Sequence, residues 1–195
     1  TSVPDIIGFA NYAWNRQINK EMSKIFLEKN KNGLVVWGGP NFPADVSSQE
    51  VFFTKFPQVD IYVPIEGEIG FSNIVKQVLT LNSFEHLRKN ILSESIPGCI
   101  IKSNNGKLQF TLALDRIQSL DEIPSPYLTG ILDECFDERL VPMIQTNRGC
   151  PFSCTFCVDG SDSVRMINEF SVQRVDDELN YIAKHVPKNQ HNLHI

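Results

Sequence analysis

The sequence lacks any apolar run long enough to cross a membrane, and it lacks a dense run of lysine and arginine. Its apolar stretches fall well short of the roughly 20 residues that a transmembrane helix needs. The first residues also lack the pattern of a secretory signal. The net charge is −5, whereas binding to a phosphate backbone depends on clustered positive charge. We therefore expect neither a membrane span nor a nucleic-acid partner.

Cysteine is absent from the first half of the chain. Three of the five cysteines, Cys150, Cys154 and Cys157, are crowded together near the end. A disulfide framework would be spread along the chain and would accompany an export signal. The clustering therefore predicts a reducing, cytoplasmic setting in which the thiols bind a metal. Cys99 and Cys135 lie outside the cluster and are expected to be buried structural thiols.

The chain also lacks an initiator methionine. Its two ends, Val3–Ala10 and Asn192–Ile195, both have the composition of strands. We therefore expect it to be a piece of a longer protein. With 42% hydrophobic and 21% charged residues, the composition is that of an ordinary globular protein with a real core.

Strands alternate with helical patterns over residues 1–82. The predicted strands are short apolar runs, Pro4–Ala10, Leu34–Trp37 and Asp60–Val63. A helix after the first strand is predicted to bury one apolar face, made of Ile18, Met22, Ile25 and Phe26. A helix after the third strand is predicted from Phe71, Ile74, Val75, Val78 and Leu79. This alternation indicates an α/β fold with a parallel, doubly wound sheet, a partial Rossmann-like domain.

Residues 83–140 predict a hairpin followed by a linker. Asn104, Asn105 and Gly106 separate two strand-like runs, Cys99–Lys102 and Leu108–Thr111, which is a hairpin signal. Two prolines in 120–127 indicate an extended connection.

Residues 141–195 predict one strand, a cysteine-rich loop, a helix and the start of another strand. Ser171 is the candidate N-cap of the helix. The helix repeats apolar residues at three- and four-residue steps, at Val172, Val175, Leu179, Ile182 and Val186. This is one βα unit, and the segment is far shorter than the roughly 250 residues of a complete eight-unit barrel.

The cysteine-rich loop contains the spacing CxxxCxxC. A [4Fe–4S] cluster usually has four thiolate ligands, so three cysteines on one loop leave one iron open for another molecule. The spacing, with Phe156 before the last cysteine and a strand before the loop, resembles that of the radical S-adenosylmethionine (SAM) superfamily. The resemblance implies that Cys150, Cys154 and Cys157 hold the cluster, that SAM binds the open iron, and that Phe156 lies beside the SAM adenine. It also implies a truncated radical SAM barrel, a partial TIM barrel, over 141–195.

The resemblance further implies a reaction. A reduced cluster cleaves SAM to a 5′-deoxyadenosyl radical, which abstracts hydrogen from a substrate, here expected to be a small molecule. The electron would come from an external donor of the flavodoxin or ferredoxin type. No catalytic side chain is assigned.

Two alternatives to this reaction stay open. One is a non-catalytic zinc or iron–sulfur binding module, although zinc prefers four protein ligands. The other is an RNA or protein methylthiotransferase, which usually carries additional cysteines in its amino-terminal part and a basic appendage. This chain has neither feature.

The amino-terminal segment 5–15, followed by 35–40, resembles the cobalamin-binding domain that precedes many radical SAM domains. Ala10 and Tyr12 occupy the places of that family's Ser-x-Leu element, and Gly38 and Gly39 occupy its Gly-Gly element at the same spacing. The side chains at the first two positions depart from the pattern. The resemblance implies a cobalamin site at these four residues and cobalamin-dependent methyl transfer. An ordinary strand-to-helix turn is the alternative for the two glycines.

Overall fold

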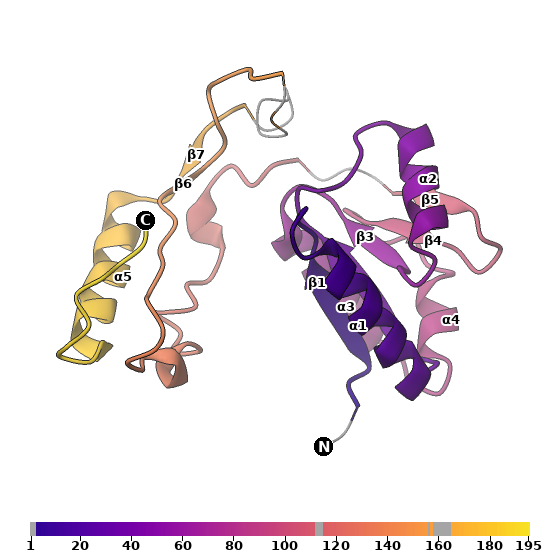
Figure 1. Ribbon diagram of the computed structural model, residues 1–195, viewed down its shortest axis with the longest axis horizontal. Helices are drawn as coiled ribbons and strands as arrows, with labels where there is room; N and C mark the ends of the chain where they lie inside the picture. Colours follow the sequence, from indigo (N-terminus) through magenta and orange to yellow (C-terminus); the bar gives the residue numbers. More distant parts are fainter. Residues whose placement is uncertain (1–2, 112–114, 156, 158–164) are drawn as a thin grey trace. The chain divides into compact units, whose positions relative to one another are not determined.

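The computed structural model describes residues 3–111, 115–155, 157 and 165–195. These fall into two compact units, Thr1–Arg116 and Ile117–Ile195, which Figure 1 shows in sequence colours. Among the described residues, no helix has both the length and the apolarity to cross a membrane.

The first unit is built on a five-stranded sheet in the order β1-β2-β3-β4-β5. Its strands are β1 (Ile6–Ala10), β2 (Leu34–Gly38), β3 (Ile61–Val63), β4 (Ile100–Lys102) and β5 (Leu108–Phe110). The first three are parallel, and the β3–β4 and β4–β5 pairs are antiparallel. The predicted parallel sheet is therefore confirmed for three strands. The predicted hairpin is also confirmed, and it extends this same sheet.

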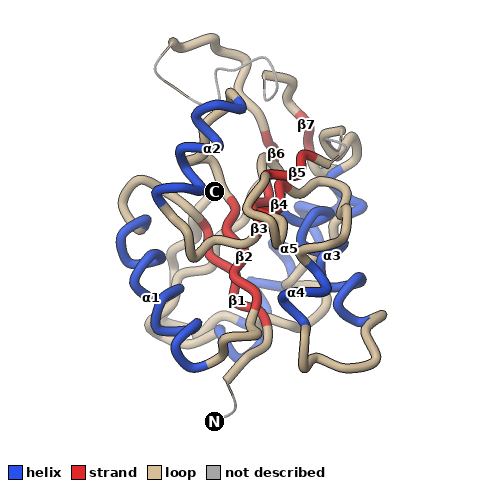
Figure 2. The backbone as a smooth tube through the Cα atoms, turned by 90° about the vertical axis from the view of Figure 1, so that its right-hand side faces the viewer, coloured by secondary structure: helices blue, strands red, loops and turns tan. Residues whose placement is uncertain are grey.

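Helices cover both faces of the sheet, as a doubly wound fold requires (Figure 2). The helices of this unit are α1 (Arg16–Lys29), α2 (Val46–Lys55), α3 (Gly67–Leu79) and α4 (Leu87–Ile91). α1 and α2 pack Phe26, Phe52 and Phe53 on the face that carries Val35 and Trp37. α3 and α4 pack on the face of Leu34 and Val36, through Ile74, Val78, Leu87 and Ile91. Successive residues of β2 are buried on opposite faces, which explains its unbroken apolar run.

The predicted apolar face of α1 is confirmed for Phe26 only and is wrong for the other three residues. The buried residues of α1 are Asn19, Ser23 and Phe26, whereas Ile18, Met22 and Ile25 are exposed. The buried polar groups are satisfied locally: Asn19 Nδ2 donates to the Ala10 carbonyl, and Ser23 Oγ accepts from Trp37 Nε1. Hydrogen bonds to β1 and β2, and not only apolar pattern, therefore fix the rotation of this helix.

The sequence pattern did not indicate α2 or α4. α2 begins at an N-cap, Asp45, whose carboxylate accepts from the Ser48 amide. Its inward side carries Phe52 and Phe53, but polar residues interrupt the 3.6-residue repeat. α4 has only five residues, too few for a repeat to show.

Among its described residues, the second unit contains one long helix and a small β-pairing. Its elements are η1 (Leu120–Glu122), η2 (Asp133–Cys135), β6 (Asn147–Arg148), β7 (Asn168–Glu169) and α5 (Val172–His185). β6 and β7 are antiparallel, and a single parallel bridge joins Met143 to His194. The Ser171 hydroxyl accepts from the Arg174 amide, so the predicted N-cap of α5 is confirmed.

The predicted extended linker is partly wrong, because it packs into the second unit. Leu120 is fully buried in a 3-10 turn. Tyr127 is buried with Ile144 and Ile182, and its hydroxyl bonds both the amide and the carbonyl of Met143. The contacts thus divide the chain after residue 116, unlike the three expected domains at 1–82, 83–140 and 141–195. That three-part scheme stays a prediction about the complete protein.

Candidate functional site

The cysteine loop begins where β6 ends. Gly149 has φ +110°, a conformation that glycine adopts without a steric cost. The following Cys150 is half-buried, while Cys154 and Cys157 are exposed. A turn joins the last two, since the Cys157 amide donates to the Cys154 carbonyl at 3.2 Å. The loop therefore presents thiols at its surface after a tight change of direction.

The three thiols suit an iron–sulfur cluster by their chemistry. All are free of disulfide bonds, and thiolates are the usual ligands of such clusters. Within the described residues, however, no group of three cysteine, histidine or acidic side chains is gathered closely enough to hold a metal ion. Phe156, the predicted SAM contact, lies outside the described residues. The ligand set thus stays a prediction.

The two remaining cysteines differ from each other. Cys99 is buried, and burial raises the pKa of its thiol to about 12. It is therefore a structural thiol, as predicted. Cys135 is exposed at the end of η2, so its expected burial is wrong. Its apolar neighbours in sequence turn inward instead, because Leu132 and Phe136 pack on the core of the second unit.

The four predicted cobalamin residues belong to one edge of the sheet in the first unit. Ala10 and Gly38 are paired at the carboxyl ends of β1 and β2, with Gly39 and Tyr12 in the loops that follow. Open parallel sheets bind ligands at this edge. Tyr12 stacks on Trp14 with ring centroids 4.6 Å apart, and Trp14 is 78% exposed. The predicted residue Tyr12 is therefore part of an accessible aromatic pair.

A buried polar cluster that sequence reasoning missed connects the loops at this edge. Asn11 is fully buried, and its Nδ2 donates to the Asn41 carbonyl at 2.6 Å and to the Tyr62 hydroxyl at 3.2 Å. The Tyr62 hydroxyl donates to the Gly39 carbonyl at 2.7 Å. Burial raises the pKa of Tyr62, so the phenol stays protonated and keeps donating. The available signal was a lone asparagine directly after an apolar strand.

Both glycines are required by the fold of the chain itself. A Cβ on Gly38 would lie 3.1 Å from the Val63 carbonyl oxygen. A Cβ on Gly39, which has φ +102°, would lie 3.1 Å from both the amide nitrogen and the carbonyl oxygen of Asn11. Close approach of neighbouring backbone is therefore enough to explain both glycines without a ligand. This agrees with the alternative of an ordinary strand-to-helix turn. Nearby, Ile65 has φ +60°, which is unusual for a β-branched residue.

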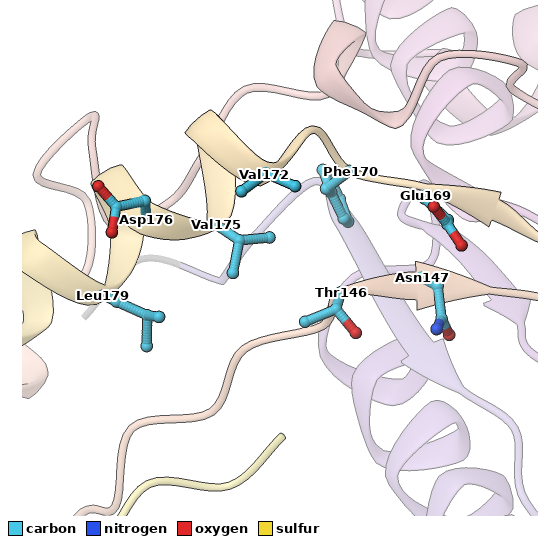
Figure 3. A pocket seen from close by; sticks show the side chains of 8 residues that line it. All are labelled: Thr146, Asn147, Glu169, Phe170, Val172, Val175, Asp176 and Leu179. Carbon is cyan, nitrogen blue, oxygen red and sulfur yellow. The ribbon is translucent and has the colours of Figure 1, made fainter.

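A cavity of about 370 Å³ lies beside the start of the cysteine loop in the second unit. Figure 3 shows its walls, with Val175 and Leu179 on α5, Asn147 on β6 and Thr146 directly before that strand. Glu169 adds a carboxylate. The cavity therefore combines an apolar wall with hydrogen-bonding groups, as small-molecule sites do.

Comparison with known proteins shows what the chain is similar to. The chain is 31% identical over 188 residues to the cobalamin-dependent radical SAM methyltransferase TokK of Streptomyces tokunonensis. It is 30% identical to the 2-(S-pantetheinyl)-carbapenam-3-carboxylate methyltransferase of Streptantibioticus cattleyicolor. Each alignment covers 93% of this chain and 26% of the relative. The chain is thus homologous to part of the cobalamin-dependent radical SAM methyltransferases, and the predicted resemblance is confirmed.

Solved structures agree on the fold. The radical SAM methyltransferase TsrM of Kitasatospora setae, with tryptophan and a SAM analogue bound, has a TM-score of 0.52 at 18% identity. The match covers 93% of this chain and 35% of that one. TsrM with cobalamin and a [4Fe–4S] cluster bound gives 0.50. No protein-family profile matches the chain. The chain spans about a quarter of the length of its curated relatives.

Proposed function

We propose that this chain is the part of a cobalamin-dependent radical SAM methyltransferase that carries the cluster loop and one edge of the cobalamin site. The observation that carries the proposal is the CxxxCxxC loop after a strand. The alignment with such an enzyme, at 31% identity, covers 93% of this chain. The substrate is proposed to be a small molecule, since TokK and its relative are named as methyltransferases and one is named for a carbapenam.

Cys150, Cys154 and Cys157 are proposed to hold a [4Fe–4S] cluster through their thiolates. When bound and reduced, such a cluster supplies the electron that cleaves SAM. The chain's own part is to keep three thiolates on one loop and to leave a coordination position for SAM. Phe156 is proposed to lie against the adenine. An external flavodoxin- or ferredoxin-type donor and a cytoplasmic setting complete the proposal, because free thiols and the cluster both need a reducing compartment.

Ala10, Tyr12, Gly38 and Gly39 are proposed to lie against cobalamin, with the loops after β1 and β2 held in place by the Asn11 and Tyr62 hydrogen bonds. Hydroxocobalamin absorbance can test this part. We expect Ala10→Trp, at an exposed edge position, to weaken binding. Ala183→Trp, at an exposed position of α5, serves as the matched control. Equal binding by the two variants would contradict the assignment.

The cluster is tested by anaerobic reconstitution with iron and sulfide. We expect about four irons per chain and an electron paramagnetic resonance signal that SAM perturbs. Cys150→Ala, Cys154→Ala and Cys157→Ala should each lower the iron content and abolish the SAM effect. Cys135→Ala is the matched control, since Cys135 is exposed in the same unit.

Two outcomes would overturn the assignment. One is an iron content that falls as much in Cys135→Ala as in the three loop variants. The other is one equivalent of zinc with no iron, which favours the alternative of a non-catalytic metal-binding module.

A further inference from the structure

The amino-terminal edge of the parallel strands, opposite the edge discussed above, holds a positively charged cavity. Its volume is about 380 Å³. Four basic side chains line it, from Lys31, Arg88, Lys89 and Lys102, against a single acidic one, Asp60. The chain as a whole has a net charge of −5. The cavity is therefore positively charged, whereas the chain as a whole is negatively charged.

The carboxylate of Asp60 is bound to groups of the first unit itself. Its side chain is fully buried, and Oδ2 accepts from the Val35 amide at 3.0 Å. Oδ1 accepts from Arg88 Nε at 3.0 Å and Nη2 at 2.7 Å. Both carboxylate oxygens are thus engaged with the start of β2 and with α4. This ion pair joins α4 to the sheet.

Lys102 is a second, half-buried cation of the cavity wall. Its ammonium group donates to the Pro57 carbonyl, a neutral acceptor that can use one of its three donors. Burial lowers the pKa of Lys102, the charge of Asp60 opposes this, and Arg88 adds to it. An anion that entered the cavity would approach Lys102 and Arg88 together. It would reduce the repulsion between them.

The rim adds charge and hydrogen-bonding groups. Lys31 and Lys89 are exposed beside the opening, and Ser103 and Asn104 lie on the turn between β4 and β5. The Asn104 amide group holds that turn against α4 by donating to the Lys89 carbonyl at 2.9 Å. This hydrogen bond therefore holds one side of the cavity wall in place, while the side chains of Lys31 and Lys89 are exposed at its mouth.

A second cavity of about 610 Å³ adjoins the first and shares Lys102 and Gly106 with it. Its lining includes Phe53 and Leu108. Lys102 thus stands between a strongly basic space and a larger, partly apolar one. This arrangement suits a molecule with an anionic end and an organic body.

We infer that this edge binds the phosphate group of a small phosphorylated compound, with Arg88, Lys102, Lys89 and Lys31 as the groups that recognise it. Phosphate has several acceptor oxygens for these donors. The net charge of −5 on the chain favours a small molecule over a nucleic-acid strand, which binds through an extended run of positive charge. Its lining residues all belong to the first unit and include none of the cysteine loop and none of the four proposed cobalamin positions.

The test is the affinity of the chain for inorganic phosphate and pyrophosphate at constant ionic strength, measured by calorimetry and by the rise in thermal midpoint. We expect pyrophosphate to bind more tightly than phosphate, and chloride to have no effect. Lys89→Met and Lys31→Met, at exposed positions, should each weaken pyrophosphate binding roughly tenfold, as expected for loss of one charged hydrogen bond. Lys102→Met should weaken it at least as much.

Lys184→Met, on α5 in the other unit, is the matched control and should bind as the unchanged chain does. The inference is overturned if the four variants bind pyrophosphate equally. It is also overturned if chloride competes as well as phosphate, or if an oligodeoxythymidylate strand binds more tightly than pyrophosphate. None of these results depends on iron, SAM or cobalamin, so the cluster proposal is tested separately.

Discussion

Replacing Gly39 by alanine tests whether the loops at the carboxyl edge are as closely packed as the structure indicates. Gly39 has φ +102°, and a Cβ there would meet two backbone atoms of Asn11 at 3.1 Å. The left-handed backbone alone costs an alanine about 1–2 kcal/mol. Overpacking against backbone that cannot easily move adds about 1–2 kcal/mol. We therefore expect Gly39→Ala to lower the free energy of unfolding by about 2–4 kcal/mol.

Two other glycines separate these contributions. Gly106 also has a positive φ, +80°, but nothing lies within 4 Å of its added Cβ. Gly106→Ala should therefore cost only the backbone term, about 1–2 kcal/mol. Gly67, the first residue of α3, has neither feature. Gly67→Ala should be neutral or stabilise by up to about 1 kcal/mol, because alanine favours helix.

The assay is equilibrium unfolding in urea, followed by the fluorescence of Trp37, which is fully buried in the first unit. A Trp14→Phe background removes the exposed indole. The three variants should share one m value and differ in midpoint. If Gly39→Ala is no less stable than Gly106→Ala, the close approach of Asn11 does not constrain this position, and the packing argument for Gly39 fails.

Two further predictions concern other residues of the first unit. Ile65→Asn should raise the free energy of unfolding by about 1 kcal/mol, since asparagine tolerates the left-handed conformation better than a β-branched residue does; Ile65→Val should bring no gain in the same urea experiment. Hydrogen bonds from the Ser47 side chain and the Ser48 amide lower the pKa of Asp45 from 3.8 to about 2. Because the folded pKa is depressed, the carboxylate stabilises α2 above about pH 4, and this contribution is lost as the pH falls toward 2. Asp45→Asn should show a smaller loss of stability over that window; parallel stability curves for the two proteins would contradict the role of Asp45 as a charged cap.

The sequence predicted those parts of the fold that repeat a local rule. The fully apolar β2, the Asn-Gly turn at Gly106 and the Ser171 cap each have a short-range physical cause, and the structure confirms them. The face of α1 could not be predicted, because Asn19 and Ser23 are buried for hydrogen bonds to groups distant in sequence. The same reason hid the roles of Asn11 and Tyr62. Their hydrogen bonds join the loop after β1, the loop after β2 and strand β3.

The candidate site was predicted unevenly. The CxxxCxxC spacing singled out the three cysteines, and the resemblance to cobalamin-binding domains placed Ala10 with Gly38. The parallel register of β1 and β2 brings this pair together. The arrangement of the thiols could not follow from spacing, since it depends on a loop whose conformation a bound cluster would help to set. The basic cavity could not be predicted from the sequence, because Lys31, Arg88 and Lys102 are far apart along the chain. No short motif unites them.

The position of β1 at the border of its sheet has a consequence for solution behaviour. Among the described strands, β1 pairs with β2 only, so one side of its backbone has no strand partner in the sheet. Its residues, Ile6–Ala10, carry no charge and no proline. Charged residues and proline are features with which proteins usually protect an edge strand. We expect concentrated samples of this chain to self-associate by strand addition there, with Asp5 as the nearest charge that opposes it.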